Sequence, residues 1–148
     1  MNTFKHILVP TDFSPSSEAA IDAAIDLAQR FDAKVTLLHV WQLPIYPYME
    51  AMMNIAALTS EVERGAAEAL EKQVQQVRGR FPAVQSVLQM GLPWQAILEL
   101  VKAQQVDLVV MGTHGRRGFE HLMLGSVAEK VVRLSPVPVL TVRGPVAT

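Results

Sequence analysis

The fold of this chain is decided by the stretch LVVMGTHGRRGFEHLMLGS, residues 108–126, in which an apolar run ends in a glycine-rich loop. The four apolar residues before the loop, 108–111, are typical of a strand buried in a parallel sheet. After the loop, Val127, Val131 and Leu134 recur at helical spacing. The stretch therefore predicts a strand, a glycine-rich turn and an amphipathic helix in direct succession.

The loop has the features of a phosphate-binding site. Glycines let backbone N–H groups approach a ligand, and a helix that starts after Gly125 adds unpaired N–H donors and the positive end of its dipole. Arg116 and Arg117 add positive charge, and the Ser126 hydroxyl can donate to phosphate or cap the helix. The alternative is that the glycines only form tight turns. The combination favours a phosphorylated small molecule, above all a nucleotide.

Strands and helices alternate along the rest of the chain, which predicts a parallel sheet with helices on both faces. We expect strands at Lys5–Pro10, Val35–Val40, Ala83–Met90, Val106–Met111 and Val137–Val142. We expect helices from Pro15, capped by Ser14 or Ser16, from about Ala57 to Arg80, from Pro93 to Gln104 and after Gly125. The resulting fold class is α/β: a three-layer, doubly wound, five-stranded parallel sheet of order 3-2-1-4-5.

In that strand order, the direction of winding reverses between the first and fourth strands. Ligands of such sheets bind at the reversal, in the crevice outside the carboxyl ends of the strands. Pro10-Thr11-Asp12 follows the first strand, and the segment Gly112 to Gly118 follows the fourth. The topology and the glycine loop therefore predict the same place for a site.

Composition sets the outer limits on function. The chain has 148 residues, of which 50% are hydrophobic and 18% charged, so we expect one globular domain over residues 1–148. A formal net charge of −1 argues against a general nucleic-acid binder. No apolar run approaches the ~20 residues of a membrane helix, and the start of the chain does not resemble a signal peptide. These features make the cytoplasm the expected location, and the absence of cysteine fits a reducing compartment.

The glycine spacing is more specific than the loop itself. Gly112, Gly115 and Gly125-Ser126 fit the pattern G-x2-G-x9-G-[ST], which resembles that of ATP-binding members of the universal stress protein family. FKHILVPTDFSPSSEAA at 4–20, VTLLHV at 35–40 and SPVPVLTV at 135–142 are similar to the family's first two strands and its last. The resemblance covers essentially the whole chain and implies a Rossmann-like fold of the adenine nucleotide alpha hydrolase-like type.

The resemblance also implies ATP and Mg²⁺ as ligands, with adenine and ribose over the ends of the first two strands and phosphates on the glycine loop. The implied binding residues are Pro10, Thr11, Asp12, Val40, Met111, Gly112, Thr113, His114, Gly115, Arg116, Arg117, Gly118, Gly125, Ser126 and Val127. Val40 would act through its backbone. The chain departs from the pattern at Ala128, where some members carry a further hydroxyl residue.

Several side chains have both a ligand-binding and a structural interpretation. Asp12 can accept from the adenine amino group or a ribose hydroxyl or lie near Mg²⁺, and it can equally form an Asx turn or helix cap. We interpret His6 and His39 as strand histidines with local partners and His121 as exposed, so no metal site is expected from protein side chains alone. The segment Tyr46 to Met53 predicts either a lid or partner surface, or helix packing.

Three functions follow from these observations. The first is a nucleotide-dependent regulatory protein of the stress-response type, with an unidentified protein partner. The second is a slow ATP hydrolase, for which the loop offers no lysine and no assured base. The third is a dimeric interaction protein that needs no nucleotide. Family members resembling this chain form dimers through the last strand, and Pro136 and Pro138 would confine the pairing to Val139 through Arg143. We accordingly expect a homodimer.

Overall fold

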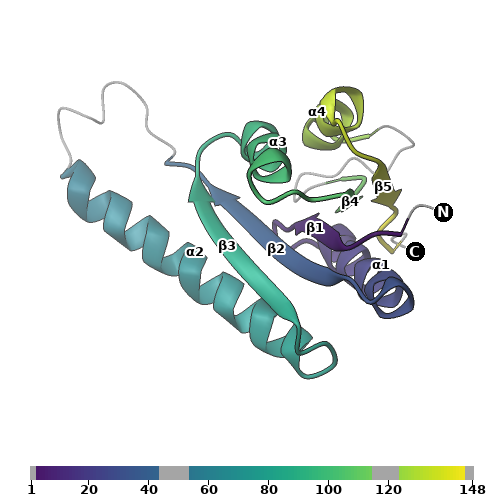
Figure 1. Cartoon of the computed structure of the whole chain (residues 1–148). Helices are drawn as coiled ribbons and strands as arrows, with labels where there is room; N and C mark the ends of the chain where they lie inside the picture. The colour runs from purple at the N-terminus through teal and green to yellow at the C-terminus, as the bar shows by residue number, and fades with distance from the viewer. Residues whose placement is uncertain (1–2, 44–53, 115–123, 146–148) are drawn as a thin grey trace.

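The computed structural model describes residues 3–43, 54–114 and 124–145, and these form alternating strands and helices (Figure 1). The elements, in chain order, are β1 (His6–Pro10), α1 (Pro15–Phe31), β2 (Lys34–Trp41), α2 (Ile55–Arg78), β3 (Val84–Met90), α3 (Pro93–Ala103), β4 (Leu108–Gly112), α4 (Ser126–Leu134) and β5 (Val139–Val142). Every strand predicted from the sequence is present.

The five strands form one sheet in the order β3-β2-β1-β4-β5, and all four pairings are parallel. This confirms the predicted order 3-2-1-4-5. Helices α1 and α2 lie on one side of the sheet, and α3 and α4 lie together on the other (Figure 1). The fold is therefore the predicted three-layer, doubly wound α/β arrangement.

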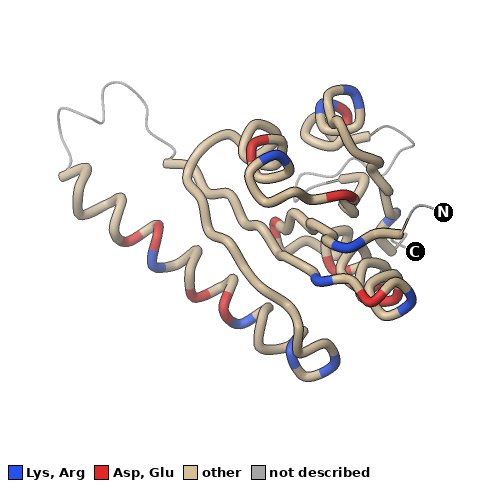
Figure 2. The backbone as a smooth tube through the Cα atoms, viewed as in Figure 1, with Lys and Arg blue, Asp and Glu red and all other residues tan. Residues whose placement is uncertain are grey.

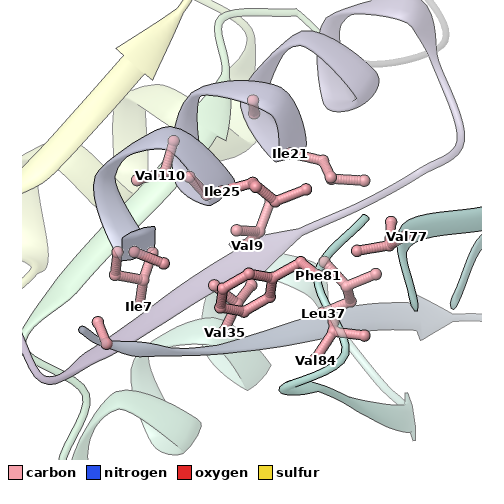
Figure 3. Packing of buried hydrophobic residues seen from close by; sticks show 14 of the residues in the cluster. Ile7, Val9, Ile21, Ile25, Val35, Leu37, Val77, Phe81, Val84 and Val110 are labelled. Carbon is pink, nitrogen blue, oxygen red and sulfur yellow. The ribbon is translucent and has the colours of Figure 1, made fainter. Parts of the chain in front are cut away.

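Each face of the sheet packs into its own hydrophobic core, because alternate strand residues point to opposite faces. Ile7 and Val9 of β1 pack with Ile21 and Ile25 of α1 in the first core, which Figure 3 shows. Leu8 of β1 packs on the opposite face, in the second core formed with α3 and α4. The central strand is thus buried on both faces, as its continuous apolar sequence predicts.

Element boundaries differ from the sequence prediction by one or two residues where capping or proline decides them. Helix α2 begins at Ile55, two residues early, because the Asn54 side chain accepts a hydrogen bond from the Ala57 N–H at 3.1 Å. Strand β5 begins only at Val139, because Pro138 cannot donate to a ladder, although its carbonyl accepts from the Val109 N–H at 3.0 Å.

Charged residues of both signs are interspersed along α2, as Figure 2 shows. Within the described ranges, we found no helix that combines the length and the apolar character needed to cross a membrane.

Candidate functional site

The predicted crevice lies between β1 and β4, which are neighbours at the centre of the sheet. From its carboxyl end β1 leads into α1, on one face, and β4 leads to α4, on the other. Two segments that leave neighbouring strands toward opposite faces open a space between them, which is where ligands of this fold class bind. The residues that surround this point are described one segment at a time below.

The turn after β1 is held by several local contacts. The Thr11 N–H donates to the Leu38 carbonyl at 2.8 Å, one residue beyond Pro10. Phe13 has a φ of 67°, a left-handed conformation that is uncommon for a residue with a side chain, and its N–H donates to Thr11 Oγ1 at 3.1 Å. The centroids of the His39 and Phe13 rings lie 4.4 Å apart. His39 Nδ1 donates to the Thr11 carbonyl at 2.8 Å. The predicted local partner of His39 is confirmed.

The Asp12 carboxylate forms the predicted Asx turn. Its Oδ1 accepts from the Ser14 N–H at 3.0 Å and from the Ser17 hydroxyl at 2.7 Å. Of the two predicted caps, Ser14 and Ser16, it is Ser14 that caps α1, with Oγ accepting from the Ser17 N–H at 3.2 Å and with Pro15 in the first turn. The structural interpretation of Asp12 is therefore confirmed, and its contact with a ligand stays a prediction.

Val40 lies beside this turn and past the end of β1. The carbonyl of Leu38 faces β1, where it accepts from Thr11, whereas the carbonyl of Trp41 faces β3, where it accepts from Gly91 at 3.0 Å. Because backbone groups alternate in direction along a strand, the N–H and C=O of Val40 face the same side as those of Leu38. They therefore point to the side on which β1 lies, beyond its last paired residue, Pro10.

Gly112, at the end of β4, has a packing role that the sequence did not reveal. A Cβ built there would lie 2.3 Å from Ser16 Oγ and 2.9 Å from the Ser16 backbone carbonyl carbon. A Cβ on Gly144 would likewise lie 2.9 Å from Ser16 Cα. The first turn of α1 thus packs directly on β4 and on the segment after β5, and only glycine permits this approach.

The two described ends of the loop that follows β4 meet each other. The Thr113 N–H donates to the Val142 carbonyl at 3.0 Å, and the Thr113 carbonyl accepts from the Gly125 N–H at 2.7 Å. His114 lies beside them, with Nδ1 3.0 Å from Thr113 Oγ1 and with its N–H directed at Ser16 Oγ at 3.5 Å. Thr113 therefore anchors the start of α4 to the end of β4 and brings Gly125 to the crevice.

The start of α4 is formed by a glycine. The N-cap residue is Gly125, in an extended conformation with φ −61° and ψ 160°, and no side chain of the described residues caps the first turn. Ser126 and Val127 open the helix, so their N–H groups belong to the donors that a helix leaves without intrahelical partners. Ala128 is buried in the second core, so the side chain at this position points into the core.

Some predicted residues fall outside the part of the chain that the structure describes. These are Gly115, Arg116, Arg117, Gly118 and His121, together with the segment from Tyr46 to Met53. Of the predicted binding residues within the described ranges, the structure places Pro10 to Asp12, Val40, Met111 to His114 and Gly125 to Val127 at or next to the carboxyl edge of the sheet.

At the opposite edge, His6 has the local partners that the sequence predicts. It is buried, its Nδ1 donates to the Gln104 carbonyl at 3.1 Å, and its Nε2 lies 2.8 Å from Thr36 Oγ1. Because a neutral imidazole carries one N–H, Nε2 accepts from the Thr36 hydroxyl. Removal from water lowers the pKa of His6, and the hydrogen bond to Gln104 opposes this shift.

Among the described residues, no group of three His, Asp or Glu side chains is arranged to hold a metal ion.

Sequence reasoning missed Ser16 and Ser17, which are buried beside Gly112 and Asp12 respectively. The signal was present as three serines within the four residues 14–17, directly after the first strand and turn. From the sequence, Ser14 and Ser16 are interpreted only as possible caps, because a serine near a proline is the ordinary start of a helix, and Ser17 has no assigned role. Their contacts with residues elsewhere in the chain depend on the tertiary fold.

Comparison with known proteins shows the same fold and sequence pattern. A model of the universal stress protein family matches residues 3–143. A universal stress protein of Methanocaldococcus jannaschii is 33% identical over 144 residues, covering 97% of this chain and 85% of that protein. The solved structure of universal stress protein UspA from Lactobacillus plantarum is 27% identical, with a TM-score of 0.82, and covers 97% of this chain and 100% of its own. A universal stress protein solved in complex with cAMP is 26% identical, with a TM-score of 0.61, over 96% of this chain and 98% of its own.

Proposed function

The chain belongs to the universal stress protein family, and we propose that it binds an adenine nucleotide, ATP with Mg²⁺, at the carboxyl edge of its sheet. The observation that carries the proposal is the uncapped start of α4 at Gly125, which Thr113 holds beside the crevice. A related protein of this family, 26% identical, was solved with the adenine nucleotide cAMP. In this proposal the bound nucleotide regulates contacts with a protein partner.

The polar groups at the crevice suit the parts of a nucleotide. The N–H groups of Ser126 and Val127, which have no intrahelical partners, and the positive dipole end of α4 suit phosphate oxygens. The backbone of Val40 offers one donor and one acceptor in the direction of a base edge, and the Asp12 carboxylate accepts from an amino or hydroxyl group. The residues present therefore match a phosphate at one end and a nucleoside at the other.

The carboxylate at the crevice suits Mg²⁺ only together with the nucleotide. Mg²⁺ usually keeps several waters and is bound through one or two carboxylates and the substrate's phosphates. Asp12 is the carboxylate that follows β1 at the crevice, and its Oδ1 already accepts two hydrogen bonds. As the alternative to its contact with the nucleoside, Asp12 would help to hold the ion beside the phosphates, whose charge Mg²⁺ would neutralise. We propose binding as the main activity, with ATP hydrolysis at most slow.

The proposal is tested by placing a negative charge at the start of α4. Ser126→Glu should lower the affinity for Mg²⁺-ATP by more than about tenfold, because the carboxylate occupies and repels the place of the phosphates. The free energy of unfolding should stay level or rise, since a negative side chain in the first turn of a helix is favourable. Calorimetric titration and urea denaturation measure the two quantities.

The matched control is Ser60→Glu, which places the same charge on an exposed position of α2. Its affinity for Mg²⁺-ATP should equal that of the unaltered protein. Mass spectrometry of ligand released by denaturing protein purified without added nucleotide should also show an adenine nucleotide. No binding of any adenine nucleotide by the unaltered protein, or equal affinity in Ser126→Glu, would contradict the proposal.

The proposal includes a homodimer formed by antiparallel pairing of Val139 through Arg143 with the same segment of a second copy. Strand β5 pairs with β4 along one side, at the end of the sheet, and Leu140 exposes 41% of its surface. A strand edge of this kind carries unpaired N–H and C=O groups unless it is covered. A closed two-fold pairing covers both edges at once.

The dimer is tested with Thr141→Pro, which removes an N–H from the middle of the proposed pairing. Thr141 also pairs with Met111 in the β4–β5 ladder, so circular dichroism must first show that the variant keeps its helices and strands. Light scattering should then report a monomer in place of the dimer of the unaltered protein. A folded variant with the unaltered mass would place the interface elsewhere.

A further inference from the structure

The Asp12 carboxylate is oriented by a buried hydroxyl on the first turn of α1. We propose that Ser17 is a positioning residue, which holds Asp12 in the plane in which it accepts a hydrogen bond from the nucleoside part of the ligand. This inference rests on the proposed nucleotide binding. It assigns nucleotide affinity to a residue whose side-chain hydrogen bonds, within the described ranges, are to Asp12 and Ser14.

Ser17 contacts Asp12 at two points. The Ser17 hydroxyl donates to Asp12 Oδ1 at 2.7 Å. Ser17 Oγ also accepts a hydrogen bond from the Asp12 N–H at 3.2 Å. The distance of 2.7 Å is in the range of hydroxyl–carboxylate hydrogen bonds, which are among the stronger ones in proteins. One contact holds the carboxylate and the other holds the backbone, so the side chain of Asp12 is restrained at both ends.

The direction of each hydrogen bond follows from the number of protons available. A serine hydroxyl has one proton, and an ionised carboxylate only accepts, so the Ser17 proton goes to Asp12 Oδ1. In the 3.2 Å contact between the two hydroxyls, Ser14 Oγ is therefore the donor and Ser17 Oγ the acceptor. Ser17 is 5% exposed, so water competes little for these bonds.

A carboxylate in a fixed plane discriminates between ligands better than a rotating one. As an acceptor it favours a nucleoside group that donates, such as an amino group or a hydroxyl, and disfavours a carbonyl at the same place. If Asp12 could rotate, part of the binding free energy would be lost in ordering it when the ligand arrives. Ser17 removes that loss beforehand, which is a function separate from capping the helix.

The test is a double-mutant cycle on the affinity for Mg²⁺-ATP, measured by calorimetry. Ser17→Ala should weaken binding by about tenfold, the scale of one hydrogen bond to a charged group. Asp12→Ala should weaken binding at least as much. Adding Ser17→Ala to Asp12→Ala should then change the affinity little, because the residue acts only through the missing carboxylate.

Equal losses from Ser17→Ala in both backgrounds would show a general effect on the turn and would overturn the inference, as would unaltered affinity in the single variant. Ser17→Thr, which keeps the hydroxyl, should restore most of the affinity. Failure of the unaltered protein to bind Mg²⁺-ATP would instead overturn the proposed function itself, so the two failures are distinguishable.

Ser14→Ala is the matched comparison for loss of stability. It removes the cap of α1 but keeps the backbone N–H that donates to Asp12 Oδ1. Its free energy of unfolding should fall by about 1 kcal/mol, the usual cost of losing a serine cap. Its affinity should fall far less than that of Ser17→Ala. An equal fall in affinity in both variants would assign the effect to the helix start and contradict a role specific to Ser17.

Discussion

The two edges of the sheet use similar polar residues in different ways. At the amino edge, Asp107 accepts from the Lys5 N–H at 2.8 Å and the His6 N–H at 3.1 Å, and His6 bonds to Thr36 and Gln104. These contacts link β1 to the elements beside it.

At the carboxyl edge the polar groups belong to two segments that leave neighbouring strands toward opposite faces of the sheet. A turn with a left-handed residue follows β1, and the start of α4 has a glycine in place of a capping side chain. The difference teaches that a histidine, aspartate or threonine at the end of a strand does not by itself predict a binding site. The segments that leave the sheet decide which partners such a residue has within the chain, and at the carboxyl edge they also decide where the proposed ligand would lie.

The largest expected effect on stability comes from Gly112, where the candidate site is also a packing contact. Gly112→Ala places a Cβ 2.3 Å from Ser16 Oγ, close also to the Ser16 backbone, so the start of α1 must move. We expect a loss of about 2 kcal/mol or more in the free energy of unfolding, as for other over-packed positions. Urea denaturation measures this loss.

The matched control is Gly65→Ala in the interior of α2, where an added Cβ meets nothing within 4 Å. That variant should be more stable by about 0.5–1 kcal/mol, because alanine is the better helix former. Equal stability changes in the two variants would show that Ser16 does not pack against Gly112, and the carboxyl edge would then be less rigid than described here.

A smaller effect is expected from the amino edge, as a dependence of stability on pH. Burial lowers the pKa of His6 in the folded chain below the value of 6.5 that applies when it is exposed. As the pH falls through 6.5, the unfolded chain therefore takes up a proton that the folded chain still refuses. Stability from this group is fully present above that pH and is lost on acidification.

The measurement compares urea denaturation of the unaltered protein and His6→Gln at pH 7.5 and pH 5.5. The unaltered protein should lose more stability between these pH values, by at most about 1.4 kcal/mol per pH unit, the limit for one proton. Nucleotide affinity at pH 7.5 should be the same in both, because His6 lies at the far edge of the sheet. Identical losses of stability would contradict the burial of a neutral His6.

The sequence predicted the fold well because its apolar runs report burial directly. Leu8 and Val9 are consecutive apolar residues that point to different cores, and this is the pattern of a central parallel strand. The glycine-rich stretch likewise predicted a strand before it and a helix that starts after Gly125, and β4 and α4 lie at these positions.

What the sequence could not predict are contacts between distant residues. Ser16 lies in the first turn of α1 and packs against Gly112 at the end of β4. These two residues are far apart in the sequence, and no local pattern predicts their contact. Asp12 illustrates a second limit, because the same residue type suits an Asx turn and a ligand contact. The structure shows the first of these roles, and the second requires binding experiments.

The most direct test of nucleotide binding at the carboxyl edge is a titration of the ¹⁵N-labelled protein with Mg²⁺-ATP, followed by amide chemical shifts in NMR. The largest changes should occur at Thr11, Val40, Thr113 and Ser126, while the amide of Asp107 at the amino edge stays unchanged. No changes at a saturating ligand concentration, or changes centred on the amino edge, would contradict the account.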